Sequence, residues 1–273
     1  MKFAICNETF QGWDWERTCR FVAGAGYDAI ELAPFTLAPD VREINSVERA
    51  RIRSVAEAAG LPITGLHWLM VCPKGLSLTT PDSDLRKASS DYLVALADFC
   101  DDIGGKVMVL GSPQQRRVPE GETAEVAIGR FLDSVRPALD RAHERGVVIC
   151  LEPLPPPEAD LLLTLGEAAV LIERLQHPAA RTIFDVKSAS WEGKPLGPLF
   201  TQYAPIVAHV HANDANRRGP GFGDTDFRPI LAAIRDAKYQ GYVSVEVFDY
   251  TPDPDTIARE SLHYMRECLA AQA

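Results

Sequence analysis

Short apolar runs without polar alternation recur along the chain, and segments with helical spacing of apolar residues separate them. The run at residues 147–153 is typical, because Val, Val, Ile, Cys and Leu lead directly to Glu152 and then to proline. A run with no polar face predicts a strand covered on both sides, as in a parallel sheet. Pro153 lacks a backbone donor, so the strand is expected to end there with Glu152 at its carboxyl end.

The same pattern predicts eight strands, each followed by a helix. The expected strands cover residues 3–6, 28–33, 63–67, 106–110, 147–153, 182–185, 206–213 and 242–247. The expected helices cover residues 15–25, 46–59, 82–103, 123–145, 165–175, 195–203, 227–238 and 255–271. This alternation predicts an α/β fold, a single (β/α)8 TIM barrel. An open doubly wound sheet is the main alternative, but the first strand is followed by Asn-Glu-Thr-Phe and not by a glycine-rich phosphate turn.

No linker rich in Ser, Gly or Pro divides the 273 residues, so we expect one TIM-barrel domain over residues 1–273. The net charge of −10 argues against broad binding of a nucleic-acid backbone. No signal segment or membrane-spanning apolar run is evident. The six cysteines lack CxxC spacing and are expected to be reduced core thiols, which favours a cytoplasmic protein.

Acidic residues and histidines lie at the ends of four consecutive predicted strands. Glu152 and Asp185 end two of these strands, His209 and His211 lie on the next, and Glu246 lies on the last. In a barrel the carboxyl ends of parallel strands meet at one rim. Period-two alternation places His209 and His211 on one face, and we expect the deeper His209 to be a hydrogen-bonded barrel residue.

Three carboxylates and an imidazole at one rim would repel one another without a cation. A divalent ion relieves that repulsion, and the oxygen-rich set favours Mn²⁺, Mg²⁺ or Co²⁺ over a structural zinc site. A single acid at a strand end is often only a helix cap or a loop salt bridge. Four such ends in succession favour a shared metal site.

These residues belong to motifs that resemble the sugar phosphate isomerase/epimerase superfamily of xylose isomerase-like TIM barrels, and within it the ketose 3-epimerases. The motifs are Leu-Glu-Pro at 151–153 with Glu158, Phe-Asp at 184–185, His-Val-His-Ala-Asn-Asp at 209–214 with Arg217, Gly-Phe-Gly-Asp-Thr-Asp-Phe at 221–227, and Gly-Tyr-Val-Ser-Val-Glu at 241–246. The resemblance covers nearly the whole chain.

The resemblance implies a role for each matching position. Glu152, Asp185, His211 and Glu246 would be the ligands of a divalent metal ion, for which we expect Mn²⁺, with Mg²⁺ or Co²⁺ as alternatives. Glu152 and Glu246 would also be the catalytic acid/base pair. Glu158 and Arg217 would contact the substrate.

Such a site suits a metal-dependent sugar isomerase or epimerase that acts on a ketose or related keto-sugar through an enediolate. The cation offsets the negative charge that develops when a proton leaves the carbon next to the ketone. Two carboxylates on opposite sides of that carbon remove the proton and return it. A lyase or dehydratase on the same barrel and a catalytically degenerate binding subunit are the alternatives. A repair nuclease would need more metal-binding histidines and a basic face.

The chain departs from the epimerase pattern near the metal aspartate. Ser188 stands where many relatives have a substrate-contacting histidine, and Phe222 also replaces a common histidine. Lys187 is either a cation for a carboxylate, phosphate or oxyanion, or a solvated loop residue.

Other strand ends offer further candidates for substrate binding. Glu31, His67 and Trp68 are expected at the rim, where each either faces the substrate or serves as a structural anchor, and Trp68 could stack on a sugar face. The expected partner is a small sugar, unphosphorylated because no glycine-rich phosphate cradle is evident, and the expected assembly is a homodimer or homotetramer. Nucleic acid and membrane are not expected partners.

Overall fold

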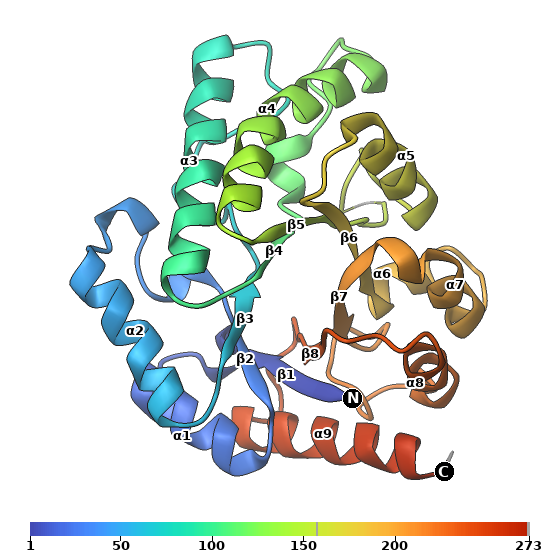
Figure 1. Cartoon of the computed structure of the whole chain (residues 1–273). Coiled ribbons are helices and arrows are strands. Elements are labelled where there is room, and N and C mark those ends of the chain that lie inside the picture. Colours follow the sequence, from blue (N-terminus) through green and yellow to red (C-terminus); the bar gives the residue numbers. More distant parts are fainter. Residues whose placement is uncertain (157, 272–273) are drawn as a thin grey trace. The chain divides into compact units, whose positions relative to one another are not determined.

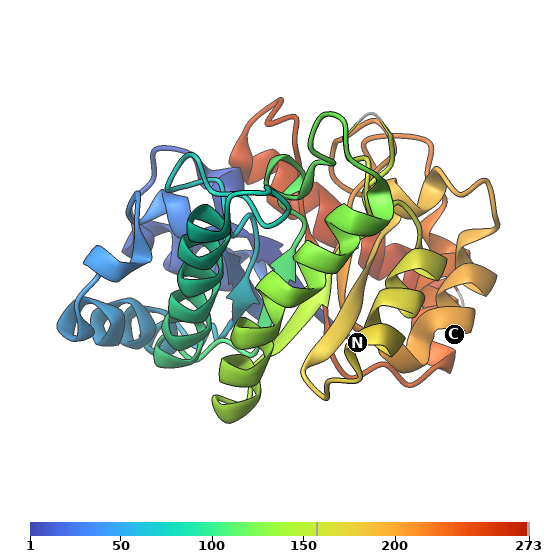
Figure 2. The same ribbon diagram turned by 90° about the horizontal axis from the view of Figure 1, so that it is seen from above.

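The apolar runs form parallel strands in the computed structural model, which describes residues 1–156 and 158–271. These strands close into a barrel in chain order, β1 to β8, and helices alternate with them (Figures 1 and 2). The described part of the chain contains β1 (Lys2–Cys6), β2 (Ala29–Leu32), β3 (Ile63–Leu66), β4 (Val107–Leu110), β5 (Val148–Leu151), β6 (Ala180–Asp185), β7 (Val207–Ala212) and β8 (Tyr242–Val245). The predicted (β/α)8 TIM barrel is confirmed, and pairing of β1 with β8 rules out the open sheet.

The helices begin and end close to the positions predicted from the sequence. They are α1 (Trp15–Ala25), α2 (Ser46–Ala58), α3 (Ser83–Asp102), α4 (Ala124–Glu144), α5 (Leu165–Leu175), α6 (Val186–Ser190), α7 (Leu196–Tyr203), α8 (Phe227–Asp236) and α9 (Pro254–Ala270). Side-chain caps explain the agreement, since Asp14 accepts a hydrogen bond from the Arg17 amide and Thr164 from the Glu167 amide. The short helix α6 was not predicted; it begins directly at the end of β6.

The chain divides into two compact units, which we describe separately. The first unit holds residues 1–32, 52–64 and 183–271, and the second holds residues 33–51 and 65–182. The boundary between them falls inside β6, after Thr182. The expectation of one domain over residues 1–273 stays a prediction.

In the first unit, β1 lies between β2 and β8. Ala4 pairs with Ala29 on one side and with Ser244 on the other. Neighbouring helices pack as α7 with α8, α8 with α9, and α9 with α1 (Figures 1 and 2). The Tyr27 hydroxyl donates to the Ala258 carbonyl at 2.7 Å and so joins the start of β2 to α9. This frame fixes the ends of β6, β7 and β8.

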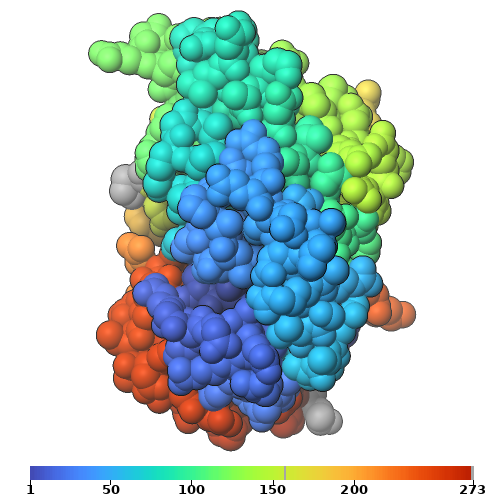
Figure 3. Space-filling model, turned by 90° about the vertical axis from the view of Figure 1, so that its left-hand side faces the viewer, coloured from blue at the N-terminus to red at the C-terminus, as the bar shows by residue number. Residues whose placement is uncertain are grey.

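In the second unit, β4 pairs with β5 in parallel register, from Val107 opposite Val148 to Leu110 opposite Leu151. Helices α3 and α4 pack against each other outside these strands (Figure 1). Figure 3 shows part of the surface of this unit in teal and green. Arg141 of α4 and Arg145, which directly follows α4, both bond to Asp98 of α3, each at 2.7 Å. The unit therefore holds the end of β5 by strand pairing and by its helical layer.

The predictions about membrane-spanning segments and cysteines can be compared with the structure. No helix within the described residues is long and apolar enough to span a membrane. All six cysteines are free thiols, as the scattered spacing predicted.

Gly65 should be essential for the pairing of β3 with β4. A Cβ atom at this position would lie 1.9 Å from the carbonyl oxygen of Val107, a backbone atom that cannot rotate away. We expect Gly65→Ala to lower the free energy of unfolding by about 3 kcal/mol, measured by urea denaturation. Gly129→Ala is the matched control, because the site within α4 has no atom within 4 Å and should gain about 1 kcal/mol in helix propensity. Equal stability of the two variants would contradict this account of the strand contact.

Candidate metal and catalytic site

Three ionisable side chains of the first unit meet at consecutive strand ends. Asp185 is the last residue of β6, His211 lies near the end of β7, and Glu246 follows β8. All three are buried, and one ligand atom from each lies within 4.8 Å of the others. His211 Nδ1 is 3.1 Å from a Glu246 oxygen and 3.8 Å from an Asp185 oxygen. Parallel register produces this meeting, since His211 pairs with Ser244, two residues before Glu246.

Asn213 holds the two carboxylates of this cluster together. Its amide nitrogen donates to Asp185 Oδ2 at 2.6 Å and to Glu246 Oε2 at 3.2 Å. Its amide oxygen accepts the backbone N–H of Lys187 at 2.9 Å. Asn213 belongs to the motif at residues 209–214, but no role was predicted for it from the sequence. Its spacing of two from His211 was the available signal, because alternate residues of an extended segment share a face.

Glu31 contacts His209 and His211 of β7, in agreement with the structural alternative for this rim residue. Its carboxylate accepts a hydrogen bond from His209 Nε2 at 2.8 Å and lies 3.3 Å from His211 Nε2. His209 is thus the hydrogen-bonded barrel residue that was expected. Because Nε2 of His211 faces Glu31, its Nδ1 faces Asp185 and Glu246. Glu31 therefore orients the imidazole of His211.

The pKa values of these groups reflect crowded negative charge in a buried site. Burial alone would raise the pKa of Glu31, but His209 and His211 hold it well below its ordinary value. Burial alone would lower the pKa of His211, but Glu246 and Glu31 raise it well above its ordinary value. Burial raises the pKa of Asp185, against the opposing charge of Lys187 and with a further contribution from Glu246. The raised pKa values of His211 and Asp185 mean that these two groups hold protons strongly, and a divalent cation would compete for the same lone pairs.

Glu152 lies in the second unit, directly after β5, and is buried as predicted. Its backbone N–H donates to the Leu110 carbonyl at 3.2 Å, and its carbonyl accepts from Arg116 Nη2 at 2.8 Å. The side chain packs over Gly111, where an added Cβ would come 2.0 Å from a Glu152 carboxylate oxygen. Burial lowers the pKa of Arg116 to about 10, although the charge of Glu152 opposes the shift. Glycine and arginine in the loop after β4 thus fix the position of Glu152.

The second unit also holds three of the predicted substrate-binding residues. His67 is buried at the end of β3, and Trp68 adopts a left-handed backbone conformation with φ of 51°. One face of Trp68 stacks on Phe35, with ring centroids 5.7 Å apart, so only its other face is available for a sugar. Glu158 lies in the loop after β5, where its carbonyl accepts a hydrogen bond from Arg117 at 2.8 Å.

Lys187 and Arg217 of the first unit both approach the ring of Phe248. Lys187 Nζ lies 4.8 Å and Arg217 Cζ 5.4 Å from the ring centroid. Lys187 is only 3% exposed, so the alternative of a solvated loop lysine is wrong. Phe222, which replaces a histidine in the resemblance, packs under the guanidinium of Arg218 at 4.8 Å.

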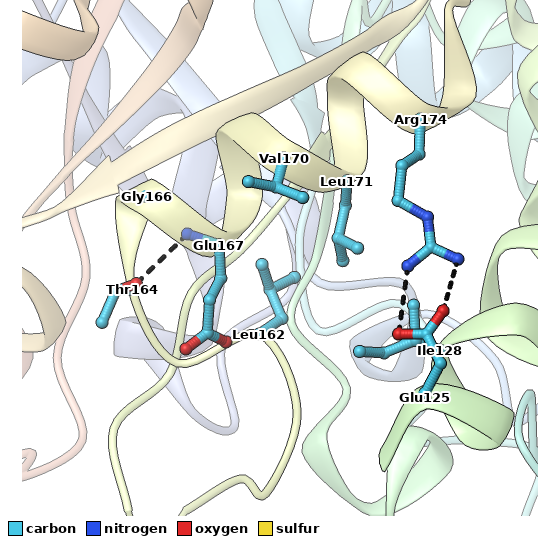
Figure 4. Close-up of a pocket in the computed structure, with 9 residues that line it drawn as sticks. All are labelled: Glu125, Ile128, Leu162, Thr164, Gly166, Glu167, Val170, Leu171 and Arg174. Atoms are coloured by element: carbon cyan, nitrogen blue, oxygen red, sulfur yellow. Dashed lines mark hydrogen bonds and ion pairs between the residues drawn. The ribbon is translucent and has the colours of Figure 1, made fainter.

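A separate surface hollow of about 460 Å³ lies between α4 and α5 in the second unit (Figure 4). Leu162 and Leu171 contribute apolar lining. Arg174 bonds to Glu125 at 2.9 Å across the hollow, and Glu167 accepts the amide of Leu163 at 2.8 Å. Since these charged groups bond within the protein, the hollow shows no arrangement for catalysis.

Comparison with known proteins places this arrangement in a family. A family model described as xylose isomerase-like TIM barrel matches residues 19–268. The chain belongs to this family. One relative is D-psicose 3-epimerase of Agrobacterium fabrum (strain C58), 26% identical over 249 residues that cover 86% of this chain and 82% of the relative. Another is 3-dehydro-D-guloside 4-epimerase of Escherichia coli (strain K12), 26% identical over 279 residues that cover 98% and 100% of the two chains.

Family membership is also visible at the level of the fold. The crystal structure of a D-psicose 3-epimerase in the presence of D-fructose has a TM-score of 0.86 at 21% identity, covering 98% of this chain and 99% of that chain. The predicted superfamily of xylose isomerase-like TIM barrels is confirmed. Both named relatives are epimerases, in agreement with the isomerase class predicted from the sequence.

Removing the charge of Glu31 should weaken the fold, because two buried imidazoles depend on one carboxylate. We expect Glu31→Gln to lower the free energy of unfolding by about 3 kcal/mol in EDTA, measured by urea denaturation. Glu16→Gln is the control, since the ion pair of Glu16 with Arg20 is exposed on α1 and should contribute no more than about 0.5 kcal/mol. A loss below 1 kcal/mol in Glu31→Gln would show that Glu31 does not anchor the histidines.

Proposed function

We propose that the protein is a metal-dependent sugar isomerase or epimerase that acts on a ketose or related keto-sugar through an enediolate. The observation that carries this proposal is the buried cluster of Asp185, His211 and Glu246 at neighbouring strand ends. Membership of the xylose isomerase-like family supports it. The named relatives are epimerases, so the lyase and binding-subunit alternatives are not favoured.

We propose Glu152 as the fourth ligand. Its place in the chain supports this, because Leu151 pairs with Thr182, and β6 then continues to Asp185. Glu152 and Asp185 therefore follow paired residues of two parallel strands and extend toward the same strand ends. The loop contacts from Gly111 and Arg116 hold the Glu152 carboxylate in a fixed position, as a ligand requires.

The donor set fits a divalent cation of intermediate hardness. Three carboxylates and one imidazole favour Mn²⁺, with Mg²⁺ or Co²⁺ as alternatives. When bound, such a cation offsets negative charge that develops on the substrate oxygens. His211 would offer Nδ1, because Glu31 occupies its Nε2 side. Asn213 would keep Asp185 and Glu246 in place before a cation binds.

Glu152 and Glu246 would perform the proton transfers. One carboxylate oxygen removes the proton from the carbon beside the ketone, and the electron pair of the C–H bond moves into the enediolate. The other group begins as the neutral carboxylic acid and donates its proton to the opposite face of the same carbon, which inverts the configuration and leaves that group ionised. Return of the proton to the neighbouring carbon would give aldose–ketose isomerisation instead.

The remaining predicted residues would orient the sugar. Glu158 would accept hydrogen bonds from the sugar through its carboxylate, Arg217 would donate them through its guanidinium, and His67 offers a buried imidazole. The exposed face of Trp68 would cover an apolar face of the sugar. We further propose a cytoplasmic protein, supported by the free thiols, that forms a homodimer or homotetramer.

The test is exchange of the substrate proton with solvent. With Mn²⁺ in D₂O, the protein should incorporate deuterium beside the ketone of a ketohexose or 3-keto-glycoside, followed by NMR, and EDTA should abolish incorporation. Glu246→Gln should reduce the rate by a factor of about 10²–10⁴, because the amide cannot carry the proton.

Glu260→Gln serves as the control with the same change of charge, since Glu260 lies exposed on α9. Its rate should match that of the unaltered protein. Unchanged exchange in Glu246→Gln, or exchange that persists in EDTA, would contradict the proposed mechanism.

A further inference from the structure

Two basic side chains of the first unit, one from a helix and one from a loop, approach one aromatic ring beside the carboxylate cluster. Lys187 comes from α6, which starts at Asp185, and Arg217 comes from the loop after β7. Both approach Phe248, at 4.8 Å and 5.4 Å from its centroid, and Phe248 lies two residues beyond Glu246. Both positive groups therefore lie close to one ring, near the proposed site of proton transfer.

The burial of Lys187 is costly and its position is fixed. A lysine that is 3% exposed has lost most of its hydration, and such residues are rare unless an opposite charge compensates them. Asn213 accepts the backbone N–H of Lys187, and the Lys187 carbonyl accepts the Ser190 hydroxyl at 2.6 Å. These bonds fix the backbone of Lys187 in α6, and the side chain is buried.

Arg217 combines an exposed side chain with a strongly constrained backbone. Its φ of 72° lies in the left-handed region, which is unfavourable for arginine and is often found at functional sites. Its carbonyl accepts the amides of Phe248 at 2.9 Å and Asp249 at 3.1 Å, and its own amide donates to Asp214 at 2.8 Å. These contacts direct the guanidinium to the ring of Phe248.

Charge compensation for the carboxylates is one explanation for Lys187, since its charge opposes the rise in the pKa of Asp185. That explanation does not account for the second cation, on a separate loop, at the same ring. Ser188 adds a further polar group, because its buried Oγ has no hydrogen-bond partner among the residues that the structure describes. A bound anionic group would account for the second cation and for the Ser188 hydroxyl.

The chemistry favours a carboxylate over a phosphate. Phosphate sites commonly use free backbone N–H groups at the start of a helix. Here the N–H groups of Lys187 and Ser188 are already bonded, to Asn213 Oδ1 at 2.9 Å and Asp185 Oδ1 at 2.6 Å. The planar guanidinium of Arg217 matches a carboxylate with two parallel hydrogen bonds, and a lysine supplies a point charge.

We propose that the substrate is a keto-sugar that carries a carboxylate, which binds between Lys187 and Arg217 beside Phe248. This inference rests on the proposed function and names the substrate class of that site. It also gives a physical reason for Lys187 beside Ser188, where the resemblance expected a histidine.

The test compares a ketohexose with the keto-hexuronate of the same configuration, in which a carboxylate replaces the terminal CH₂OH. With the Mn²⁺-loaded protein, kcat/KM for deuterium exchange should be at least 30-fold higher for the keto-hexuronate. Lys187→Met and Arg217→Met should each reduce this preference at least tenfold, and rising salt should reduce it in the unaltered protein. Arg217→Met keeps the test valid if Lys187→Met fails to fold, because the Arg217 side chain is exposed and its loss should not disturb the fold.

Lys194→Met is the matched control, since Lys194 is exposed and pairs with Glu192 at 3.0 Å. It should retain the full preference. An equal loss on both substrates in Lys187→Met would show that Lys187 only compensates the carboxylates, and would overturn the inference. A higher kcat/KM for the ketohexose 6-phosphate than for the keto-hexuronate would overturn the choice of a carboxylate.

Calorimetric binding of the same compounds separates this inference from the proposed reaction. If neither sugar exchanges deuterium but the keto-hexuronate binds at least tenfold more tightly in a Lys187-dependent manner, the reaction fails and the carboxylate site stands. If the kcat/KM for deuterium exchange is the same for the ketohexose and the keto-hexuronate, the reaction stands and the carboxylate site fails.

Discussion

The burial of several carboxylates at neighbouring strand ends is the constraint on which the rest of the candidate site depends. Ionised groups lose solvation there, so each oxygen needs a donor or a cation. Asn213 supplies donors to Asp185 and Glu246, and His209 supplies one to Glu31. The barrel provides these partners because its parallel strands end at one level. The site is thus partly assembled by hydrogen bonds before any cation or substrate binds.

Patterns local in the sequence predicted much of this arrangement. Continuous Val- and Ile-rich runs located the strands, and helices 15–25 and 165–175 begin after the capping residues Asp14 and Thr164. Alternation also placed His211 and Glu246 at strand ends. These features depend on nearest neighbours and on strand period, which a single sequence displays directly.

Features set by contacts between distant segments were harder to predict. The sequence left open whether Glu31 is a substrate-facing or a structural residue, and in the structure it bonds to histidines 178 and 180 residues away. Strand alternation gives a face but does not say which partner will occupy it. The bridging role of Asn213 and the burial of Lys187 likewise depend on how α6 packs beside β7. The assignment of Glu152 to the same metal ion as Asp185, His211 and Glu246 stays a prediction.

The account separates a part of the site shared with the family from a part particular to this chain. The acids and His211 match the cation ligands that the resemblance implies, while Ser188 and Phe222 stand where the epimerase pattern has histidines. Chemistry and substrate choice are therefore assigned to different residues, and each can be altered without redesigning the other.

The central claim is that the carboxylates and His211 bind one divalent cation. Anomalous diffraction at the manganese edge from crystals grown with Mn²⁺ tests it most directly. The account predicts one strong peak bonded to Nδ1 of His211 and to carboxylate oxygens of Glu152, Asp185 and Glu246, with Glu31 still bonded to His211 Nε2. A peak ligated by Glu31, or no peak at His211 in saturating Mn²⁺, would contradict it.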